Sequence, residues 1–267
     1  MSDTEHPGQA LLDVQAGVAT LTLDNPKRKN AITQGMARQI DEFCKRVSSD
    51  ESIGALVIRG AGNYFCSGAD TRDLGSTSQH PASDASVQST SAVYQSFVRV
   101  GSLPVPTISV VIGGAVGAGL NMALATDAMV TTPTAIFDSG FLARGIHPGG
   151  GHISLLGRSV GQSLAASMAL FGHPIDGRQA EDLGWALHCG AEETLDDFVS
   201  RLVAKAAADP KLVRRIKTSV QLELGPPAIS WQQAVEVERG VQMWSLGRKG
   251  AEGWDSKPAK PTVDRTA

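Results

Sequence analysis

The fold is decided by a short stretch in the middle of the chain, Thr107–Gly119, which reads TISVVIGGAVGAG. Its first half, Thr107–Ile112, is an apolar run rich in β-branched residues and predicts a buried strand. A turn of glycine and alanine follows and leads into a helix predicted over Ala118–Ala125. Because the first N–H groups of a helix have no partner within it, such a turn suits the binding of a developing oxyanion.

A glycine-rich turn can also bind a nucleotide, but this one departs from the two common nucleotide patterns. A dinucleotide fingerprint needs a third glycine after Gly117-Ala118-Gly119, and the chain has Met122 at that position. The turn also lacks the Lys-Ser or Lys-Thr ending of a phosphate-binding P-loop. A serine nucleophile on a strand-to-helix elbow is not expected either. Stabilisation of an oxyanion is therefore the chemistry that the turn favours.

Upstream of this stretch, strand and helix patterns alternate. Leu11–Val14 and Val18–Leu23 alternate apolar and polar residues around Ala16-Gly17, which predicts a β-hairpin. Ile53–Arg59 is a β-branched run and predicts a buried strand. Thr33 is a suitable N-cap for a helix between these strands. The predicted apolar face of that helix consists of Met36, Ile40, Phe43, Cys44 and Val47.

The remaining segments complete an α/β pattern. Gly75–Ser91 is rich in Ser, Gln, Asp and Pro, so we expect a mobile surface loop, either a lid or a disordered segment. Val93–Val100 is predicted to be helical, and Ala128–Thr132 is predicted to be a strand. The last third, from about Leu164, is expected to be almost entirely helical. Alternating strands and helices predict repeated ββα units and a layered α/β core.

Composition and charge exclude several classes of protein. The chain has 267 residues and a formal net charge of −3, whereas a general nucleic-acid binder is normally basic. Cys44, Cys66 and Cys189 are too dispersed for a disulfide framework or a zinc site, so we expect reduced thiols and no metal. Met1–Ala10 lacks a signal-peptide pattern, and no apolar run is long enough to span a membrane. These features predict a cytoplasmic protein.

Two further segments are typical of ligand binding. Lys27, Arg28 and Lys29 are consecutive cations in a turn before a helix, where they favour phosphate, although a solvated basic turn has the same pattern. The segment Asn63–Asp70 follows a predicted buried strand, and its small residues would let a ligand approach the backbone. A tight turn that needs Gly68 explains that second pattern equally well.

Taken in order, these segments resemble the crotonase (enoyl-CoA hydratase/isomerase) superfamily. The similarity runs over roughly residues 10 to 255, and its specificity lies in the order of the motifs more than in any single one. The matching pieces are Leu23–Pro26 with Asn30-Ala31, Phe65–Asp70, Gly113–Gly119, Asp127, Phe137, Gly145–Gly150, Ala180–Ala186 and Glu252-Gly253.

The resemblance implies a fold class, a ligand and an assembly. The fold would be α/β, a crotonase-type spiral of repeated ββα units with a C-terminal helical trimerisation region. Residues 1–195 would form the acyl-CoA-binding core, and residues 196–267 the helical region. The ligand would be a small-molecule acyl-CoA, with the coenzyme A thioester as substrate and no separate cofactor. A homotrimer or hexamer is expected, and the apolar stripes available for it are Phe198, Leu202 and Ala206, and Trp231, Val235 and Val241.

The resemblance also implies the site residues. By position, the backbone N–H groups of Ala69 and Ala118 would hold the thioester oxygen, as two such groups do in the family. The turn containing Lys27, Arg28 and Lys29 would face the phosphates of coenzyme A. The other substrate-binding positions carried over are Ser67 and Gly68, whose backbone would face adenine, and Asp70, Gly117 and Phe141.

The family's acid–base residues are missing. Hydratases of the family use two glutamates, and Asn121 and Phe141 stand in their places. A positioned acid or base is typically worth about 10²–10⁴-fold in rate, so ordinary enoyl-CoA hydration is expected to be badly impaired. The nearby substitutes are Asp138 and His147, with His152 a weaker candidate because it begins a predicted helix. An aspartate that another branch of the family uses would fall at Gly149.

Two functional hypotheses follow. In the first, the chain is an enzyme that acts on acyl-CoA through an oxyanion-stabilised intermediate, with Asn121 orienting a water and an unusual base. In the second, the chain binds acyl-CoA without turnover, which the loss of both glutamates favours. The acidic and imidazole groups that remain near the predicted pocket favour the enzyme.

Overall fold

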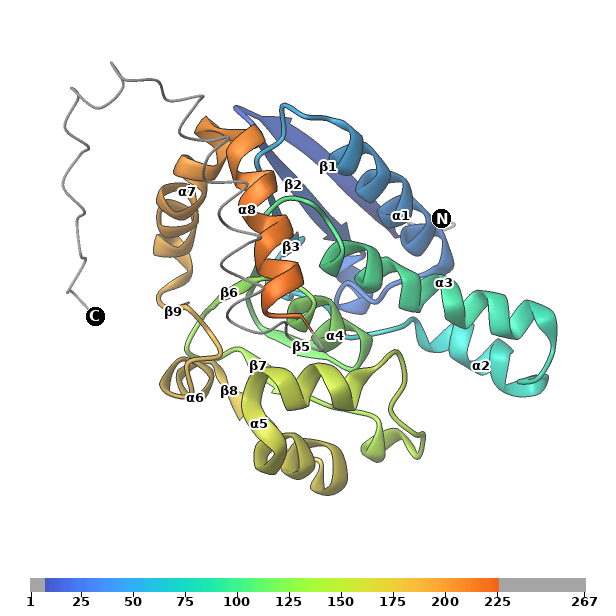
Figure 1. Ribbon diagram of the computed structural model, residues 1–267. Coiled ribbons are helices and arrows are strands. Elements are labelled where there is room, and N and C mark those ends of the chain that lie inside the picture. Colours follow the sequence, from blue (N-terminus) through green and yellow to red (C-terminus); the bar gives the residue numbers. More distant parts are fainter. Residues whose placement is uncertain (1–7, 226–267) are drawn as a thin grey trace, which may run out of the picture. The chain divides into compact units, whose positions relative to one another are not determined.

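Figure 1 shows the computed structural model of the chain, in which residues 8–225 are described. The chain divides into two compact units, residues 1–214 and residues 215–267. The predicted division at residue 195 separates an acyl-CoA-binding core from a helical region, and it stays a prediction. No helix within the described residues is both long and apolar enough to cross a bilayer.

The first unit contains two β-sheets. The larger has six strands in the order β1-β2-β3-β4-β6-β9, in which β1 is antiparallel to β2 and the other neighbours are parallel. The smaller has the order β5-β7-β8, with β5 and β7 parallel. The strands are β1 (Gln9–Gln15), β2 (Val18–Asp24), β3 (Ala55–Gly60), β4 (Thr107–Val111), β5 (Gly114–Val116), β6 (Ala128–Thr131), β7 (Ile136–Asp138), β8 (Ile175–Asp176) and β9 (His188–Cys189).

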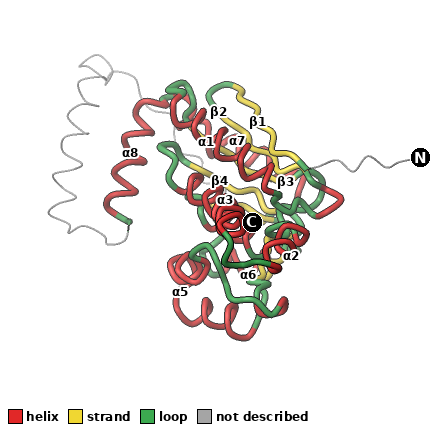
Figure 2. The backbone as a smooth tube through the Cα atoms, turned by 90° about the vertical axis from the view of Figure 1, so that its right-hand side faces the viewer, coloured by secondary structure: helices red, strands yellow, loops and turns green. Residues whose placement is uncertain are grey.

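Helices connect and cover these strands, as Figure 2 shows in red beside the yellow strands. The helices are α1 (Gln34–Ser49), α2 (Thr71–Gln79), α3 (Asp84–Gly101), α4 (Ala118–Leu124), α5 (His152–Phe171), α6 (Gly177–Asp182), α7 (Glu192–Ala208) and α8 (Pro210–Glu223). Two short 3-10 turns, η1 (Pro26–Arg28) and η2 (Leu142–Arg144), complete the path. The α/β architecture expected from the sequence is confirmed.

The two faces of the larger sheet belong to two different apolar clusters. On β3, Leu56 and Ile58 join a cluster that includes buried residues of α1, α3 and α4. The alternate residues, Ala55 and Val57, join a second cluster with α7. Successive side chains of a strand point to opposite faces, so a strand buried on both sides reads as a continuous apolar run. The predicted buried strands of β3, β4 and β6 are thereby confirmed.

Local signals explain the first elements. The hairpin is confirmed, with Gln15 paired to Val18 across a turn whose residues Ala16 and Gly17 both have positive φ. The predicted cap of α1 is also confirmed, because the Thr33 hydroxyl accepts a hydrogen bond from the backbone N–H of Met36 at 3.2 Å. Such a side-chain acceptor satisfies one of the unpaired N–H groups at a helix start.

The predicted loop over Gly75–Ser91 is wrong, because the segment lies in α2 and α3 with only a short turn between them. Both helices begin at side-chain caps: Asp70 accepts from the N–H of Arg72 at 2.8 Å, and Ser83 accepts from the N–H of Ser86 at 3.3 Å. The polar start of α3 continues into an apolar half that is buried in the core, and this packing holds the whole helix. The composition of Gly75–Ser91 alone did not reveal this packing.

The prediction of a helical last third holds for α5 to α8 but misses β8 and β9. These strands have two residues each, too few to show an alternating pattern. On α7 the buried stripe is Leu195, Val199 and Val203. Of the predicted stripe, Phe198 and Ala206 are partly buried against the same cluster, whereas Leu202 is 38% exposed. The buried stripe packs on β3 and β6. The second predicted stripe, at Trp231, Val235 and Val241, lies outside the described residues.

A pair of glycine substitutions tests this packing. At Gly119 a Cβ atom would lie 2.3 Å from the carbonyl oxygen of Cys66, whereas at Gly75 it would meet no atom within 4 Å. We expect Gly119→Ala to lower the free energy of unfolding by about 1–3 kcal/mol or more. We expect Gly75→Ala to raise it by about 0.5–1 kcal/mol, because alanine favours a helix. Urea unfolding measures both, and equal stabilities of the two variants would contradict the packing described.

Candidate active site

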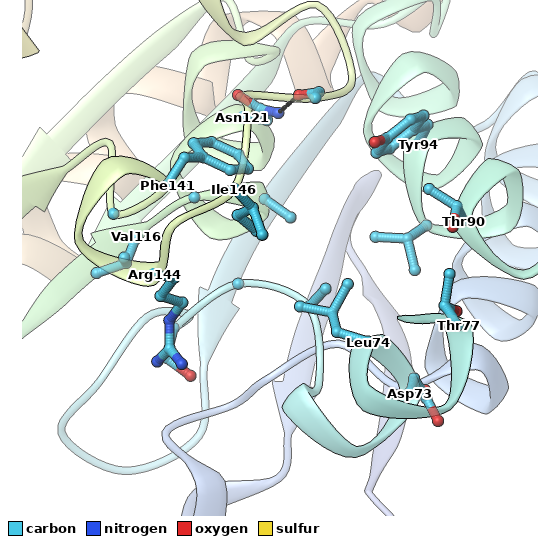
Figure 3. A pocket seen from close by; sticks show the side chains of 18 of the residues that line it. Asp73, Leu74, Thr77, Thr90, Tyr94, Val116, Asn121, Phe141, Arg144 and Ile146 are labelled. Carbon is cyan, nitrogen blue, oxygen red and sulfur yellow. Dashed lines mark hydrogen bonds between the residues drawn. The ribbon is translucent and has the colours of Figure 1, made fainter. Parts of the chain in front are cut away.

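One cavity brings most of the predicted site residues together. Figure 3 shows Phe141 and Ile146 on one side of it and Leu74, Thr90 and Tyr94 on the other. Its walls come from the segment after β3, from α2 and α3, from the start of α4, and from the loop that follows β7. The predicted site residues that line it are Ser67, Gly68, Ala69, Gly117, Ala118, Asn121, Phe141 and His147.

The first wall is an extended segment that lies between two neighbouring backbones. On one side Ile32 donates to the carbonyl of Gly68 at 2.8 Å and accepts from the N–H of Asp70 at 2.9 Å. On the other side Cys66 forms a bridge with Ala115 of β5. The carbonyl of Gly68 and the N–H of Asp70 form the two hydrogen bonds of the bridge with Ile32. The N–H of Ala69, which lies between them, therefore points away from Ile32. Within residues 8–225, that N–H has no hydrogen-bond acceptor.

The second wall is the start of α4. Gly117 precedes the helix with φ of 55°, a conformation that favours glycine, and Ala118 is the first helical residue. The N–H of Ala118 also has no acceptor in the part of the chain that the structure describes. The two walls approach closely, since a Cβ atom on Gly68 would lie 3.5 Å from the nitrogen of Ala118. Two residues with unpaired backbone N–H groups therefore line the same cavity.

Behind the cavity, three polar side chains form a buried chain of hydrogen bonds. Nδ2 of Asn121 donates to the carbonyl of Gly149 at 3.1 Å, and Oδ1 of Asn121 lies 2.7 Å from Nδ1 of His152. Nε2 of His152 lies 2.8 Å from Oγ of Ser139. All three side chains are almost fully buried, and Asn121 and Ser139 line the cavity.

The carbonyl of Gly149 fixes the direction of this relay. A carbonyl only accepts, so the Asn121 amide must turn its NH₂ group towards Gly149 and its oxygen towards His152. That oxygen only accepts too, so Nδ1 of His152 carries the proton and Nε2 carries the lone pair. The hydroxyl of Ser139 therefore donates to Nε2. Burial lowers the pKa of His152 to about 4, which leaves the imidazole neutral at physiological pH.

Of the two substitutes predicted for the missing glutamates, Asp138 lies outside the cavity lining and His147 lies at its exposed edge. Oδ1 of Asp138 accepts from the N–H of Gly140 at 2.9 Å, which caps the turn after β7, and Asp138 is not among the described residues that line the cavity. His147 lines the cavity but is exposed, and its Nδ1 lies 2.7 Å from the carbonyl of Pro148. The ring of Phe141 meets His152 edge-on, with ring centroids 4.9 Å apart.

The three cations of the basic turn, Lys27, Arg28 and Lys29, have different surroundings. The guanidinium of Arg28 pairs with the buried carboxylate of Asp70 at 2.9 Å, so it holds the turn against the start of α2. Burial raises the pKa of Asp70, but hydrogen bonds from Arg72 and the charges of Arg28 and Arg72 outweigh this and leave it below its usual value. Lys27 and Lys29 are exposed.

Ser139 was missed by sequence reasoning, and His152 was considered only as the weaker candidate for a base. A Gly-x-Ser-x-Gly pattern does occur at Gly157–Gly161, but it lies inside α5, where Ser159 donates to the carbonyl of Leu155. It is therefore not a nucleophile elbow. Ser139 has no motif of its own. The available signal was a small polar residue placed directly after the short strand β7, which pairs with β5 beside the glycine-rich turn.

The neutral, buried imidazole makes stability depend on pH. The pKa of His152 is 6.5 ordinarily and about 4 in the folded chain. Between these two pH values the imidazole is protonated in the unfolded chain and neutral in the folded chain. We expect this site to destabilise the fold progressively as pH falls from about 6.5 to about 4, by at most about 3 kcal/mol. The measurement is the unfolding free energy of wild type minus that of His152→Gln. A difference that does not change across this pH range would contradict the prediction.

Comparisons with known proteins agree with this architecture. The sequence profile of the enoyl-CoA hydratase/isomerase family matches residues 13–244. Probable enoyl-CoA hydratase EchA14 of Mycobacterium tuberculosis (strain ATCC 25618 / H37Rv) is 36% identical over 239 residues, covering 88% of this chain and 91% of that protein. The 1,2-epoxyphenylacetyl-CoA isomerase of Escherichia coli (strain K12) is 35% identical over 201 residues, covering 75% and 76%.

Among solved structures, a Thermobifida fusca YX protein in complex with acetoacetyl-CoA is 26% identical and matches with a TM-score of 0.79. The match covers 90% of this chain and 95% of that one. These matches in sequence and in fold each cover three quarters or more of this chain and of the protein compared. The chain belongs to the enoyl-CoA hydratase/isomerase family, within the crotonase superfamily.

Proposed function

We propose that this enzyme binds an acyl-CoA thioester in the cavity and stabilises negative charge on the thioester oxygen with the N–H groups of Ala69 and Ala118. The observation that carries the proposal is that both residues line one cavity and that neither N–H group has an acceptor within residues 8–225. Buried or half-buried backbone N–H groups are nearly always paired in folded proteins. Two that are unpaired in one cavity are suited to a ligand oxygen.

The relatives support a coenzyme A ester as the ligand. The Escherichia coli relative is named for an epoxyphenylacetyl-CoA, and the Thermobifida fusca neighbour holds acetoacetyl-CoA. For the phosphates, we propose the exposed cations Lys27 and Lys29, while the ion pair of Arg28 with Asp70 holds the turn in place. The backbone at Ser67 and Gly68, which also lines the cavity, remains the proposed contact for adenine.

Ordinary hydration of an enoyl-CoA is not the activity that the site favours. Asn121 cannot act as an acid or a base at ordinary pH, and its amide is already bonded to Gly149 and His152. Phe141 presents an aromatic ring at the other glutamate position. At Gly149, a Cβ atom would lie within contact of the Tyr94 hydroxyl, so no aspartate fits there without a shift of Tyr94. A base for this site must come from another group.

The oxyanion contact can be tested by removing one N–H group. Ala118 is the first residue of α4, where proline is well tolerated because that N–H takes no part in the helix. We expect wild type to bind acetoacetyl-CoA and to raise the near-ultraviolet absorption of its enolate. We expect Ala118→Pro to lose this signal and to weaken any turnover by about 10²–10³-fold.

The matched control is Ala118→Gly, which keeps the N–H group and should keep the enolate signal. Circular dichroism and thermal unfolding establish that both variants are folded. An enolate signal that survives in folded Ala118→Pro would refute the assignment of this N–H group. Absence of acetoacetyl-CoA binding by wild type would refute the proposed function as a whole.

Hydration itself gives a second prediction. With crotonyl-CoA, we expect hydration at least about 100-fold slower than that of a family member with both glutamates, because two acid–base groups are missing. The measurement is the loss of enoyl absorption at saturating substrate. A rate equal to that of such a hydratase would show that another group replaces the glutamates. Tight acyl-CoA binding with no turnover of any acyl-CoA would favour the non-catalytic hypothesis.

A further inference from the structure

The relay behind the cavity has the composition and order of a nucleophilic triad. A hydroxyl donates to the lone-pair nitrogen of a neutral imidazole, and the opposite nitrogen of that imidazole is held by an amide oxygen. The distances, 2.8 Å and 2.7 Å, are within the range in which a base accepts a proton from a nucleophile. Such arrangements are identified by geometry and role, because they recur on unrelated folds in different chain orders.

The nucleophile lies next to the oxyanion donors. Strands β5 and β7 are parallel and pair Val116 with Asp138, and the N–H of Gly117 donates to the carbonyl of Asp138 at 3.1 Å. The next residues along the two strands are Gly117 and Ser139, and a Cβ atom on Gly117 would lie 3.7 Å from the Ser139 carbonyl oxygen. Ser139 therefore lies opposite Gly117, the residue that precedes Ala118. Ala69, Ala118 and Ser139 all line the cavity.

We propose that Ser139, His152 and Asn121 act as nucleophile, base and positioning residue in the hydrolysis of an acyl-CoA thioester. This inference rests on the proposed function, because the same thioester oxygen must occupy the site at Ala69 and Ala118. It adds a reaction and a covalent intermediate to that function. The substrate class is an acyl-CoA with an apolar acyl group, since Leu74 and Val93 line the cavity.

The reaction proceeds in two steps, acylation of Ser139 and hydrolysis of the acyl ester. Oγ of Ser139 bonds to the thioester carbon while its proton passes to Nε2 of His152, and the oxygen takes the negative charge beside the two N–H groups. Collapse breaks the carbon–sulfur bond, and the thiolate leaves with the proton from Nε2 as free coenzyme A. Water then attacks the carbonyl carbon of the acyl-Ser139 ester and gives a proton to Nε2. Collapse of this second intermediate breaks the bond between the carbon and Oγ, Oγ takes the proton back from Nε2, and the carboxylic acid leaves.

The surroundings of His152 suit a base more than a purely structural residue. Burial keeps the imidazole neutral, so Nε2 can accept a proton at physiological pH, while the same lowered pKa makes it a weaker base than a free imidazole. The edge contact with Phe141 covers the ring and limits access of water to it. A structural network would need no member in contact with the ligand cavity, yet Ser139 and Asn121 both line it. Asn121 orients the imidazole of His152 but, unlike a carboxylate, places no negative charge beside it.

The test combines product release with detection of the intermediate. Wild type is incubated with butyryl-CoA and decanoyl-CoA, free thiol is followed with a thiol reagent, and the intact protein is weighed by mass spectrometry. We expect release of coenzyme A and, after acid quenching, an acyl adduct on Ser139. We expect Ser139→Ala and His152→Gln to lower the release at least about 100-fold and to lose the adduct.

Two matched variants separate the nucleophile from general damage. Ser139→Cys keeps a nucleophile and should accumulate an acyl adduct on residue 139. Ser159→Ala, which alters the serine of the pattern inside α5, should behave as wild type. Ser139→Ala should still bind acetoacetyl-CoA and raise its enolate absorption, because it keeps both backbone N–H groups.

A fluorophosphonate gives a readout that does not depend on the acyl chain. It should label Ser139 in wild type and in Ser159→Ala, and it should fail to label Ser139→Ala or His152→Gln. Acetoacetyl-CoA binding by wild type with neither thiol release nor labelling would overturn the triad and leave the proposed function intact. Hydrolysis that persists in Ser139→Ala would overturn the triad as well. Failure of wild type to bind acetoacetyl-CoA would overturn both.

Discussion

The candidate site depends on one constraint, the position of the extended segment Cys66–Asp70 between two backbones. Its hydrogen bonds to Ile32 on one side and to the strand β5 on the other use the groups that point sideways, and they leave the N–H of Ala69 for the cavity. The segment fits only because its neighbours have no side chains at the contact points, as at Gly119, which lies against the carbonyl of Cys66. Without these bonds the two N–H groups would have no fixed relation to each other.

The turn before α1 supports that segment from outside. Asn30 is fully buried, and its NH₂ group donates to the carbonyls of Ala61 and Tyr64, so the turn is tied to the loop that precedes the site. The ion pair between Arg28 and Asp70 ties the same turn to the start of α2. The cations at this turn therefore have different surroundings although they are adjacent in the chain. Charge in a motif identifies a candidate, and only the partners of each charge define its role.

Local patterns made much of the fold predictable. The cap at Thr33 and the buried strands carry their signals within a few residues, and the resemblance placed Ala69 and Ala118 by position. The helical character of Gly75–Ser91 was not predictable from its composition, because it depends on caps and on the buried half of α3. The relay was missed because Asn121, Ser139 and His152 come from α4, the loop after β7 and the start of α5. The pairing of β5 with β7 and the packing of α4 on α5 bring these elements together.

The helices α2 and α3 form part of the cavity wall with residues that are mostly polar and exposed on their outer faces. A few inward positions, such as Leu74 and Thr77, line the cavity and lie outside the large core cluster. Substitutions at these inward positions can change the volume open to an acyl tail with little effect on the remainder of the molecule. The size of the cavity can therefore change through α2 and α3 while the backbone geometry at Ala69 and Ala118 stays the same.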